Sequence, residues 1–207
     1  MATRNYFLIL CFILLFHACN NRVVDTDETL DAAIIEYEKE NYGKAFKLFS
    51  EIIEFNPKIS LAYAYRGDIY FLNNNYIKAI LDYDKAIRWN PKFVRAWFGK
   101  ARISHELGDL LGAIDLYNHT LKINNKHIDA YHYRGKAKFD MGDLYSSLSD
   151  LNQSLELDSL QAGVFLLRAL VHLQIADTTK ACHDFINADI LGDSTAILHI
   201  RKNCLDN

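Results

Sequence analysis

Hydrophobic and polar positions recur along this chain with a period of about 34 residues, a spacing typical of a solenoid built from stacked units. Stepping along the chain by one period, one series meets only small residues, a second only large apolar or aromatic residues, a third only aromatic residues and a fourth only basic residues. The series are Ala45, Ala79, Ala113, Ser147 and Ala181; Phe49, Tyr83, Tyr117, Leu151 and Phe185; Tyr63, Trp97, Tyr131 and Phe165; and Arg66, Lys100, Arg134 and Arg168.

Each period predicts two amphipathic helices joined by a tight turn. In the clearest unit we expect helices over about 61–73 and 77–89, separated by three asparagines. Pro91 ends the second helix because it has no N–H group to donate. Gly108 and Gly142 mark the same turn in the next two units, where a left-handed helix cap suits glycine.

The physics of helix packing explains the series. The two helices of a unit must approach closely, so one crossing position holds Ala or Ser. The aromatic series, which contains Trp97, is expected to fill the space between neighbouring units. A single unit cannot bury its apolar face, whereas a stack makes a continuous core from nearest-neighbour contacts.

One unit carries a motif that resembles the tetratricopeptide repeat (TPR) signature: Tyr63, Arg66, Gly67, Tyr70, Ala79, Tyr83, Ala86 and Pro91. The resemblance implies an all-α fold, a right-handed α-solenoid of about five helix-turn-helix units with a C-terminal capping helix. We place the units at 26–59, 60–93, 94–127, 128–161 and 162–195. We divide the chain into a lipoprotein signal peptide (1–18), a polar tether (19–29), the TPR array (30–195) and the capping helix (196–207).

The N-terminal residues differ from the rest of the chain. Arg4 precedes an unbroken apolar run over residues 6–16, which is shorter than the roughly 20 residues of a membrane-spanning helix. A basic start and a short apolar core are typical of a signal peptide. Ala18 and Cys19 resemble a bacterial lipobox, although His17 is atypical. The resemblance implies cleavage before Cys19 and a lipid such as palmitate on that residue.

The expected location is therefore the cell envelope, where the protein would be lipid-anchored and periplasmic or surface-facing. An uncleaved anchor and a plainly secreted protein remain alternatives. Cys11 is a second candidate for lipidation, but no polar flank follows it. Export leaves one cysteine pair, Cys182 and Cys204, in a compartment where disulfides persist. The alternative is two buried free thiols that pack as small apolar residues.

Composition and motifs give no indication of an enzyme. The net charge is -3, whereas a nucleic-acid binder needs a basic face. The sequence has no HExxH, GxSxG, GxxxxGK[ST] or CxxC motif. His105 and His132 could share the inside of the superhelix, but we interpret them as binding-face residues and expect no metal or cofactor.

The TPR resemblance implies that the first helix of each unit lines a concave groove that binds another protein or a peptide segment. Aromatic and Arg residues are common binding anchors. The fifth unit offers Leu166, Leu170 and Leu173, which are either covered by the cap or bind something. The predicted groove residues are Asp68, Phe71, Arg95, Phe98, Arg102, His105, His132, Lys136 and Phe139.

The sequence thus favours a non-catalytic adaptor that holds a partner protein at a membrane. One alternative is an accessory factor in envelope assembly, secretion or glycan uptake, which contacts its clients transiently. A purely structural spacer is another. The carboxylate clamp of some chaperone-binding TPR domains is absent, because its positions hold Leu30, Ile34, Ala64 and Asp68.

Overall fold

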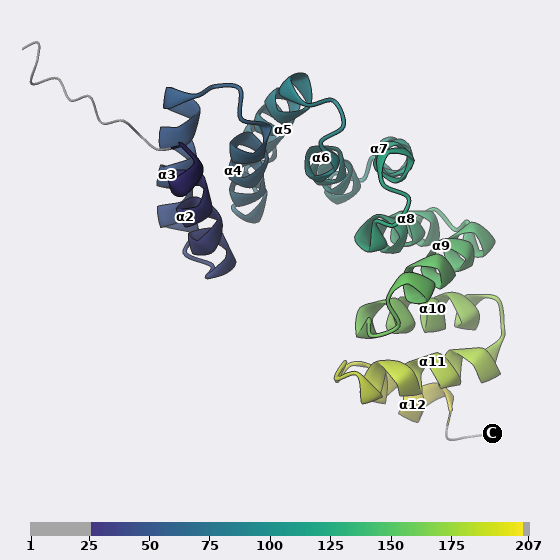
Figure 1. Ribbon diagram of the computed structural model, residues 1–207. Helices are drawn as coiled ribbons and strands as arrows, with labels where there is room; N and C mark the ends of the chain where they lie inside the picture. Colours follow the sequence, from purple (N-terminus) through teal and green to yellow (C-terminus); the bar gives the residue numbers. More distant parts are fainter. Residues whose placement is uncertain (1–25, 205–207) are drawn as a thin grey trace, which may run out of the picture.

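The computed structural model describes residues 26–204, within which eleven α-helices follow one another and no strand occurs. The helices stack into a curved arc with the first at one end and the last at the other (Figure 1). This architecture confirms the predicted all-α solenoid. The expected signal peptide, Cys19 and residues 205–207 of the expected cap lie outside the described residues.

Ten of the helices form five antiparallel pairs, one pair per predicted unit, and an eleventh follows them. None of the helices within 26–204 is long and apolar enough to cross a membrane. The pairs are α2 (Thr26–Glu38) with α3 (Tyr42–Phe55), α4 (Ser60–Leu72) with α5 (Tyr76–Trp89), α6 (Val94–Glu106) with α7 (Leu110–Ile123), α8 (Ile128–Asp140) with α9 (Leu144–Leu157), and α10 (Ala162–Gln174) with α11 (Thr178–Ile190); α12 (Ala196–Asn203) follows them.

The first helix begins earlier than the expected tether allows. Residues 26–29 form the first turn of α2 and are not an extension of the tether. Asp27 and Glu28 lie in that turn, where the positive end of the helix dipole favours acidic side chains. The acidic residues that suggested a tether therefore also suit the start of a helix.

The turn between the paired helices uses one backbone conformation in every unit. Gly108 and Gly142 have φ values of 80° and 82°, as expected for a left-handed cap. Glu40, Asn74 and Ala176 occupy the equivalent positions and are also left-handed, with φ between 57° and 61°. The turn geometry is thus imposed by the repeat itself, and three units adopt it without glycine.

The crossing of the two helices in each unit is fully buried, as the periodic series predicts. The five small residues at the crossing, from Ala45 to Ala181, are all 0% exposed, and so are the five large residues from Phe49 to Phe185. Between units the packing is equally close. A Cβ atom on Gly67 would lie 2.8 Å from the Tyr83 ring, and one on Gly99 would collide with the same ring. Two glycines on neighbouring units therefore let α4 and α6 close on one tyrosine.

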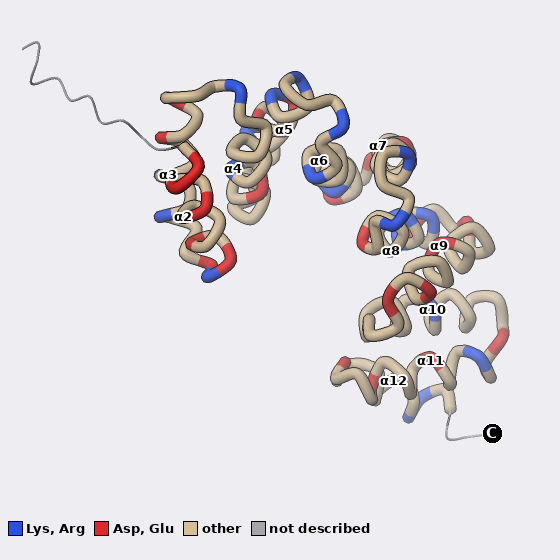
Figure 2. The backbone as a smooth tube through the Cα atoms, viewed as in Figure 1, with Lys and Arg blue, Asp and Glu red and all other residues tan. Residues whose placement is uncertain are grey.

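The basic series links successive units on their polar side. Arg168 donates through Nε to Asp184 at 2.7 Å in its own unit, and through a second nitrogen to Asn152 at 2.7 Å in the preceding unit. The same two-way contact occurs at Arg66 and Arg134. Lys100 instead pairs with Asp84 of the preceding unit at 2.7 Å. Figure 2 shows that Lys and Arg are interspersed with Asp and Glu along the arc, which suits this pairing.

The C-terminal end is closed by α12. Cys182 of α11 and Cys204, the residue after α12, form a disulfide with their Cα atoms 5.7 Å apart. Phe185 is 0% exposed, and Ile200 of α12 packs against its cluster. The leucines of the fifth unit, Leu166, Leu170 and Leu173, pack against the same cluster and are partly buried.

The close approach around Tyr83 gives a direct stability test. Gly99→Ala should lower the free energy of unfolding by about 1–3 kcal/mol, because the added methyl overpacks the Tyr83 ring. Gly163 is a matched control in α10, since no atom lies within 4 Å of a Cβ built there. Gly163→Ala, in the first turn of α10, should leave stability unchanged or raise it by at most about 0.5 kcal/mol. Urea unfolding followed by circular dichroism measures both, and equal effects would contradict the packing described.

Candidate functional site

The concave wall is formed by the first helix of each unit. Each of α4, α6 and α8 contacts the first helix of the unit before it and of the unit after it, so these helices lie side by side along one face. A pocket of about 430 Å³ lies on this wall, between units that Figure 1 shows near the middle of the arc. Its lining brings together four predicted groove residues, Asp68, Arg95, Phe98 and Arg102, with Tyr37, Val94, Gly99, His127 and Asp129.

One side of the pocket is closed by an internal ion pair. Arg95 donates through Nε to the Asp68 carboxylate, and the Tyr83 hydroxyl donates to the other oxygen of that carboxylate at 2.6 Å. Burial raises the pKa of Asp68, and Arg95 and Tyr83 partly offset this. The Arg95 guanidinium also stacks on Tyr65, with its Cζ atom 3.8 Å from the ring centre. Arg95 and Asp68 therefore satisfy each other, and neither is a free charge for a partner.

Arg102 lies on the other side of the pocket and is not paired. Its Cζ atom is 4.1 Å from the centre of the Phe71 ring, 5.9 Å from that of Phe98 and 5.7 Å from that of Tyr133. Among residues 26–204, no acceptor lies within hydrogen-bonding or ion-pairing distance of its guanidinium. A guanidinium held by aromatic rings, with its donors unused, is suited to binding a carboxylate.

The repeat explains why Arg102 is unpaired. It stands one repeat period after Asp68, so an arginine replaces the carboxylate of the preceding unit. Asp129 stands one period after Arg95, so the Asp68–Arg95 pair of one unit boundary corresponds to Arg102 and Asp129 at the next, with the charges exchanged. Asp129 nevertheless makes no ion pair with Arg102. Tyr117, the counterpart of Tyr83, is 0% exposed and its hydroxyl has no hydrogen-bond partner. The bonds that join Asp68, Tyr83 and Arg95 therefore have no counterpart among Arg102, Tyr117 and Asp129, one repeat period later.

The other predicted groove residues are placed differently from one another. His105 Nε2 lies 2.8 Å from an Asp140 oxygen, so its side chain is already bonded to α8. His132 packs against Tyr133, with ring centres 5.0 Å apart. Lys136 is exposed. Phe139 packs against the buried cluster around Leu151, which makes it part of the core more than of the groove.

Sequence reasoning missed four aromatic residues of the site: Tyr37, Tyr65, His127 and Tyr133. Tyr65 and Tyr133 occupy the same position two units apart, and each lies beside an arginine of α6. That recurrence was visible in the sequence. The role of His127 was not visible in the sequence, because His127 lies just before α8 and not within a first helix. It accepts a hydrogen bond from the Ala130 backbone N–H, and its ring centre lies 4.8 Å from that of Phe98.

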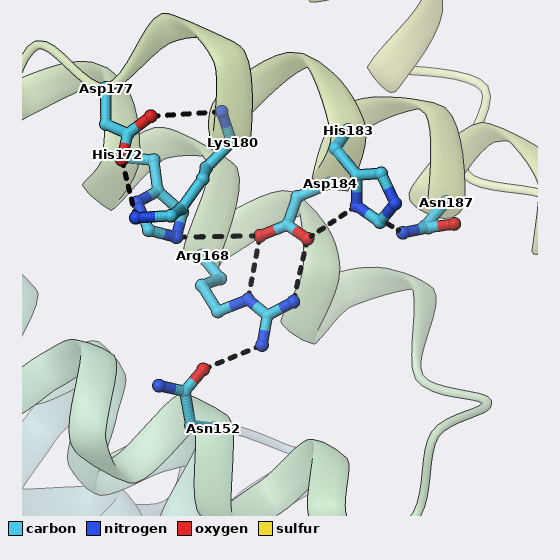
Figure 3. Close-up of polar contacts among 8 residues, drawn as sticks. All are labelled: Asn152, Arg168, His172, Asp177, Lys180, His183, Asp184 and Asn187. Atoms are coloured by element: carbon cyan, nitrogen blue, oxygen red, sulfur yellow. Dashed lines mark hydrogen bonds and ion pairs between the residues drawn. The ribbon is translucent and has the colours of Figure 1, made fainter.

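A second cluster of polar residues lies between α9, α10 and α11, around a pocket of about 410 Å³ (Figure 3). Arg168 is bonded to Asp184 and Asn152, and Lys180 pairs with Asp177 at 2.8 Å. The cations of this cluster are therefore already paired. The cluster is one step of the basic series that links the units, which makes it structural.

No group of three or more His, Cys, Asp or Glu side chains within 26–204 is arranged to hold a metal ion. The two histidines predicted to share the inner surface, His105 and His132, do not form such a group. The pocket combines a partly buried arginine with aromatic rings, and both residue types are common at protein interfaces.

Comparison with known proteins finds family models that match part of the chain. Two family models match, both described as tetratricopeptide repeat, over residues 60–93 and 82–115. A comparison with curated proteins finds no match.

Solved structures share the fold. The chain is 18% identical to "YrrB: a TPR protein with an unusual peptide-binding site", covering 90% of this chain and 97% of that one with a TM-score of 0.66. It is 15% identical to pilF of Pseudomonas aeruginosa, covering 86% and 82% with a TM-score of 0.77. It is 23% identical to a tetratricopeptide repeat protein from Parabacteroides merdae, covering 97% and 78% with a TM-score of 0.66. At these identities the likeness establishes the fold alone.

The half-buried histidine of the groove predicts a pH dependence of stability. Burial lowers the pKa of His132, with smaller opposing and reinforcing effects from Asp129 and Lys136. The unfolded chain, where a histidine pKa is about 6.5, therefore binds the proton first as pH falls. His132 should thus lower stability below about pH 6.5 and have no such effect above it.

We expect Tm to fall between pH 7 and pH 5.5 and to fall less in His132→Gln. His183→Gln is the control, because the His183 side chain is 77% exposed on α11. The assignment is wrong if the two variants lose the same Tm over this range.

Proposed function

We propose that this chain, whose tetratricopeptide repeat fold supports a role as a scaffold for protein–protein interaction, is a non-catalytic adaptor whose concave groove binds a peptide segment of a partner protein. We further propose that a lipid on Cys19 holds it on a bacterial envelope membrane. The observation that carries the proposal is the pocket on α4, α6 and α8, where Arg102 is unpaired beside Phe71 and Phe98.

The composition of the pocket favours a peptide over a small apolar ligand. Aromatic and arginine side chains are enriched among the few residues that dominate binding energy at protein interfaces, and here they occur together on one wall. The wall continues along neighbouring first helices on both sides of α6, which suits an extended segment. YrrB is described as a TPR protein with an unusual peptide-binding site, which is a precedent on the same fold.

The membrane anchor rests on the N-terminal sequence. Ala18 and Cys19 resemble a lipobox, and α2 begins at Thr26. With six residues between Cys19 and Thr26, the two residues lie at most about 25 Å apart when the chain is fully extended. A lipid on Cys19 would therefore hold the first unit close to the membrane surface, with the groove of the middle units farther along the arc.

Selection from a displayed library of random dodecapeptides with capped ends tests the groove. Wild-type protein should enrich a set of related peptides. Phe98→Ala should bind them at least tenfold more weakly, because interface aromatics of this kind are worth about 2 kcal/mol or more. Tyr145→Ala is the control, since Tyr145 is 77% exposed on α9. Circular dichroism checks that helicity is unchanged. The groove is not the site if no peptide is enriched, or if Phe98→Ala binds the set as tightly as wild type.

Fractionation tests the anchor separately. Wild-type protein expressed in a bacterium should sediment with membranes, and Cys19→Ser should move to the soluble fraction because the acceptor of the lipid is gone. Cys11→Ser is the matched control and should leave the protein on membranes. Sedimentation of Cys19→Ser with membranes, or release by Cys11→Ser, would refute lipidation at Cys19.

A further inference from the structure

The cations on the inner wall differ in how far they are already used. Arg95 is bonded to Asp68 and stacked on Tyr65. Lys136 is exposed, so its charge is largely screened by water. Arg102 is partly buried and has no acceptor among residues 26–204. Of these three cations, Arg102 is the one positioned to bind a ligand with more than long-range attraction.

The surroundings of Arg102 prepare it for an anion. The ring of Phe71 lies against the guanidinium, with Phe98 and Tyr133 farther out. Stacking restricts the side chain while leaving the N–H edge free, which reduces the entropy lost when a ligand binds. Partial burial also strengthens a charge-assisted hydrogen bond relative to one in water.

The protein itself contains the arrangement that such a ligand would form. One unit earlier on the same wall, the Asp68 carboxylate accepts bonds from Arg95 and from the Tyr83 hydroxyl. In the next unit an arginine replaces that aspartate, and no carboxylate among residues 26–204 forms a hydrogen bond or ion pair with this arginine. The wall therefore has one carboxylate–arginine pair completed internally and one arginine left without its carboxylate.

Two carboxylates line the same pocket as Arg102, those of Asp68 and Asp129. Asp68 is bonded to Arg95 and Tyr83; burial raises the pKa of this carboxyl, and Arg102 also helps to lower it. Asp129 forms no ion pair with Arg102. An unpaired carboxylate in the pocket repels an incoming acid and competes for Arg102. Its removal should strengthen the binding of an acidic ligand in this pocket.

On these grounds we propose that Arg102 binds the carboxylate of an aspartate or glutamate side chain in the peptide that occupies the groove. The proposal rests on the proposed function, since it names the chemistry of the segment. A side chain is favoured over a chain end because α6 is the third of five first helices. The wall continues to α4 on one side and to α8 on the other, so a bound chain passes Arg102 in both directions.

The peptides enriched on the wild-type protein provide the test. They should share an Asp or Glu at one position, and replacing it by Asn or Gln should weaken binding about tenfold. Arg102→Gln should weaken binding of the acidic peptide by a similar factor. The amide peptide should bind Arg102→Gln no worse than it binds wild type, because the two changes remove the same contact.

Two further variants separate this contact from general attraction. Lys136→Gln removes the same net charge from the wall and should weaken binding less than about threefold, as expected for an exposed charge. Asp129→Asn should tighten binding of the acidic peptide. A decrease caused by Asp129→Asn, or equal losses from Lys136→Gln and Arg102→Gln, would overturn the proposal.

The failures of the two proposals are distinguishable. Enriched peptides that depend on Phe98 but share no acidic residue would overturn the role of Arg102 and leave the groove intact. Coupling to Arg102 that appears only in a parallel library with free C-terminal carboxylates would overturn the side-chain assignment. Only the lack of any enriched peptide, or binding that ignores Phe98, would overturn the groove itself.

Discussion

The close approach of helices around one buried ring is the constraint on which the rest of the solenoid depends. Tyr83 is enclosed between Gly67 and Gly99, and neither position can carry a methyl group without a collision or a shift. This approach brings α4 and α6 side by side, so that the Tyr83 hydroxyl reaches Asp68 and Asp68 reaches Arg95. The core contact therefore also sets the spacing of the first helices along the concave wall.

Arginine has two different roles in this protein. On the polar side of the solenoid, Arg66, Arg134 and Arg168 each bind a residue of their own unit and one of the preceding unit. These contacts stabilise the stacking of one unit on the next. On the concave wall, Arg95 is bonded to Asp68 of the preceding unit, whereas Arg102 has no hydrogen-bond or ion-pair partner among residues 26–204. Arg102 therefore differs from these four arginines, each of which is bonded to a carboxylate.

The sequence was sufficient to predict the fold, because the repeat period records the crossing contacts directly. Small residues such as Ala79 occupy the crossing and are fully buried there. The start of α2 at Thr26 was misjudged because acidic residues suit both a polar tether and a first helical turn. The left-handed turn at Glu40 and Ala176 was also missed, since neither residue type signals it.

The site was predicted less completely. The groove list contained Arg95, Asp68 and Arg102, but composition alone could not tell which charges cancel. Arg95 and Asp68 belong to different units, and their pairing depends on how one first helix is placed against the next. His105 and Asp140 pair in the same way across two units. Residue types indicated a binding wall, and only the three-dimensional arrangement shows which of its charges is free.

The measurement that tests the central claim most directly is site-specific photo-crosslinking in intact cells. A benzoylphenylalanine at position 71, beside Arg102, is compared with one at position 145 on the exposed side of α9. The account predicts one discrete cross-linked product from position 71 that disappears when Arg102→Gln is added, and no such product from position 145. A product at position 145 alone, or one at position 71 that persists without Arg102, would contradict it.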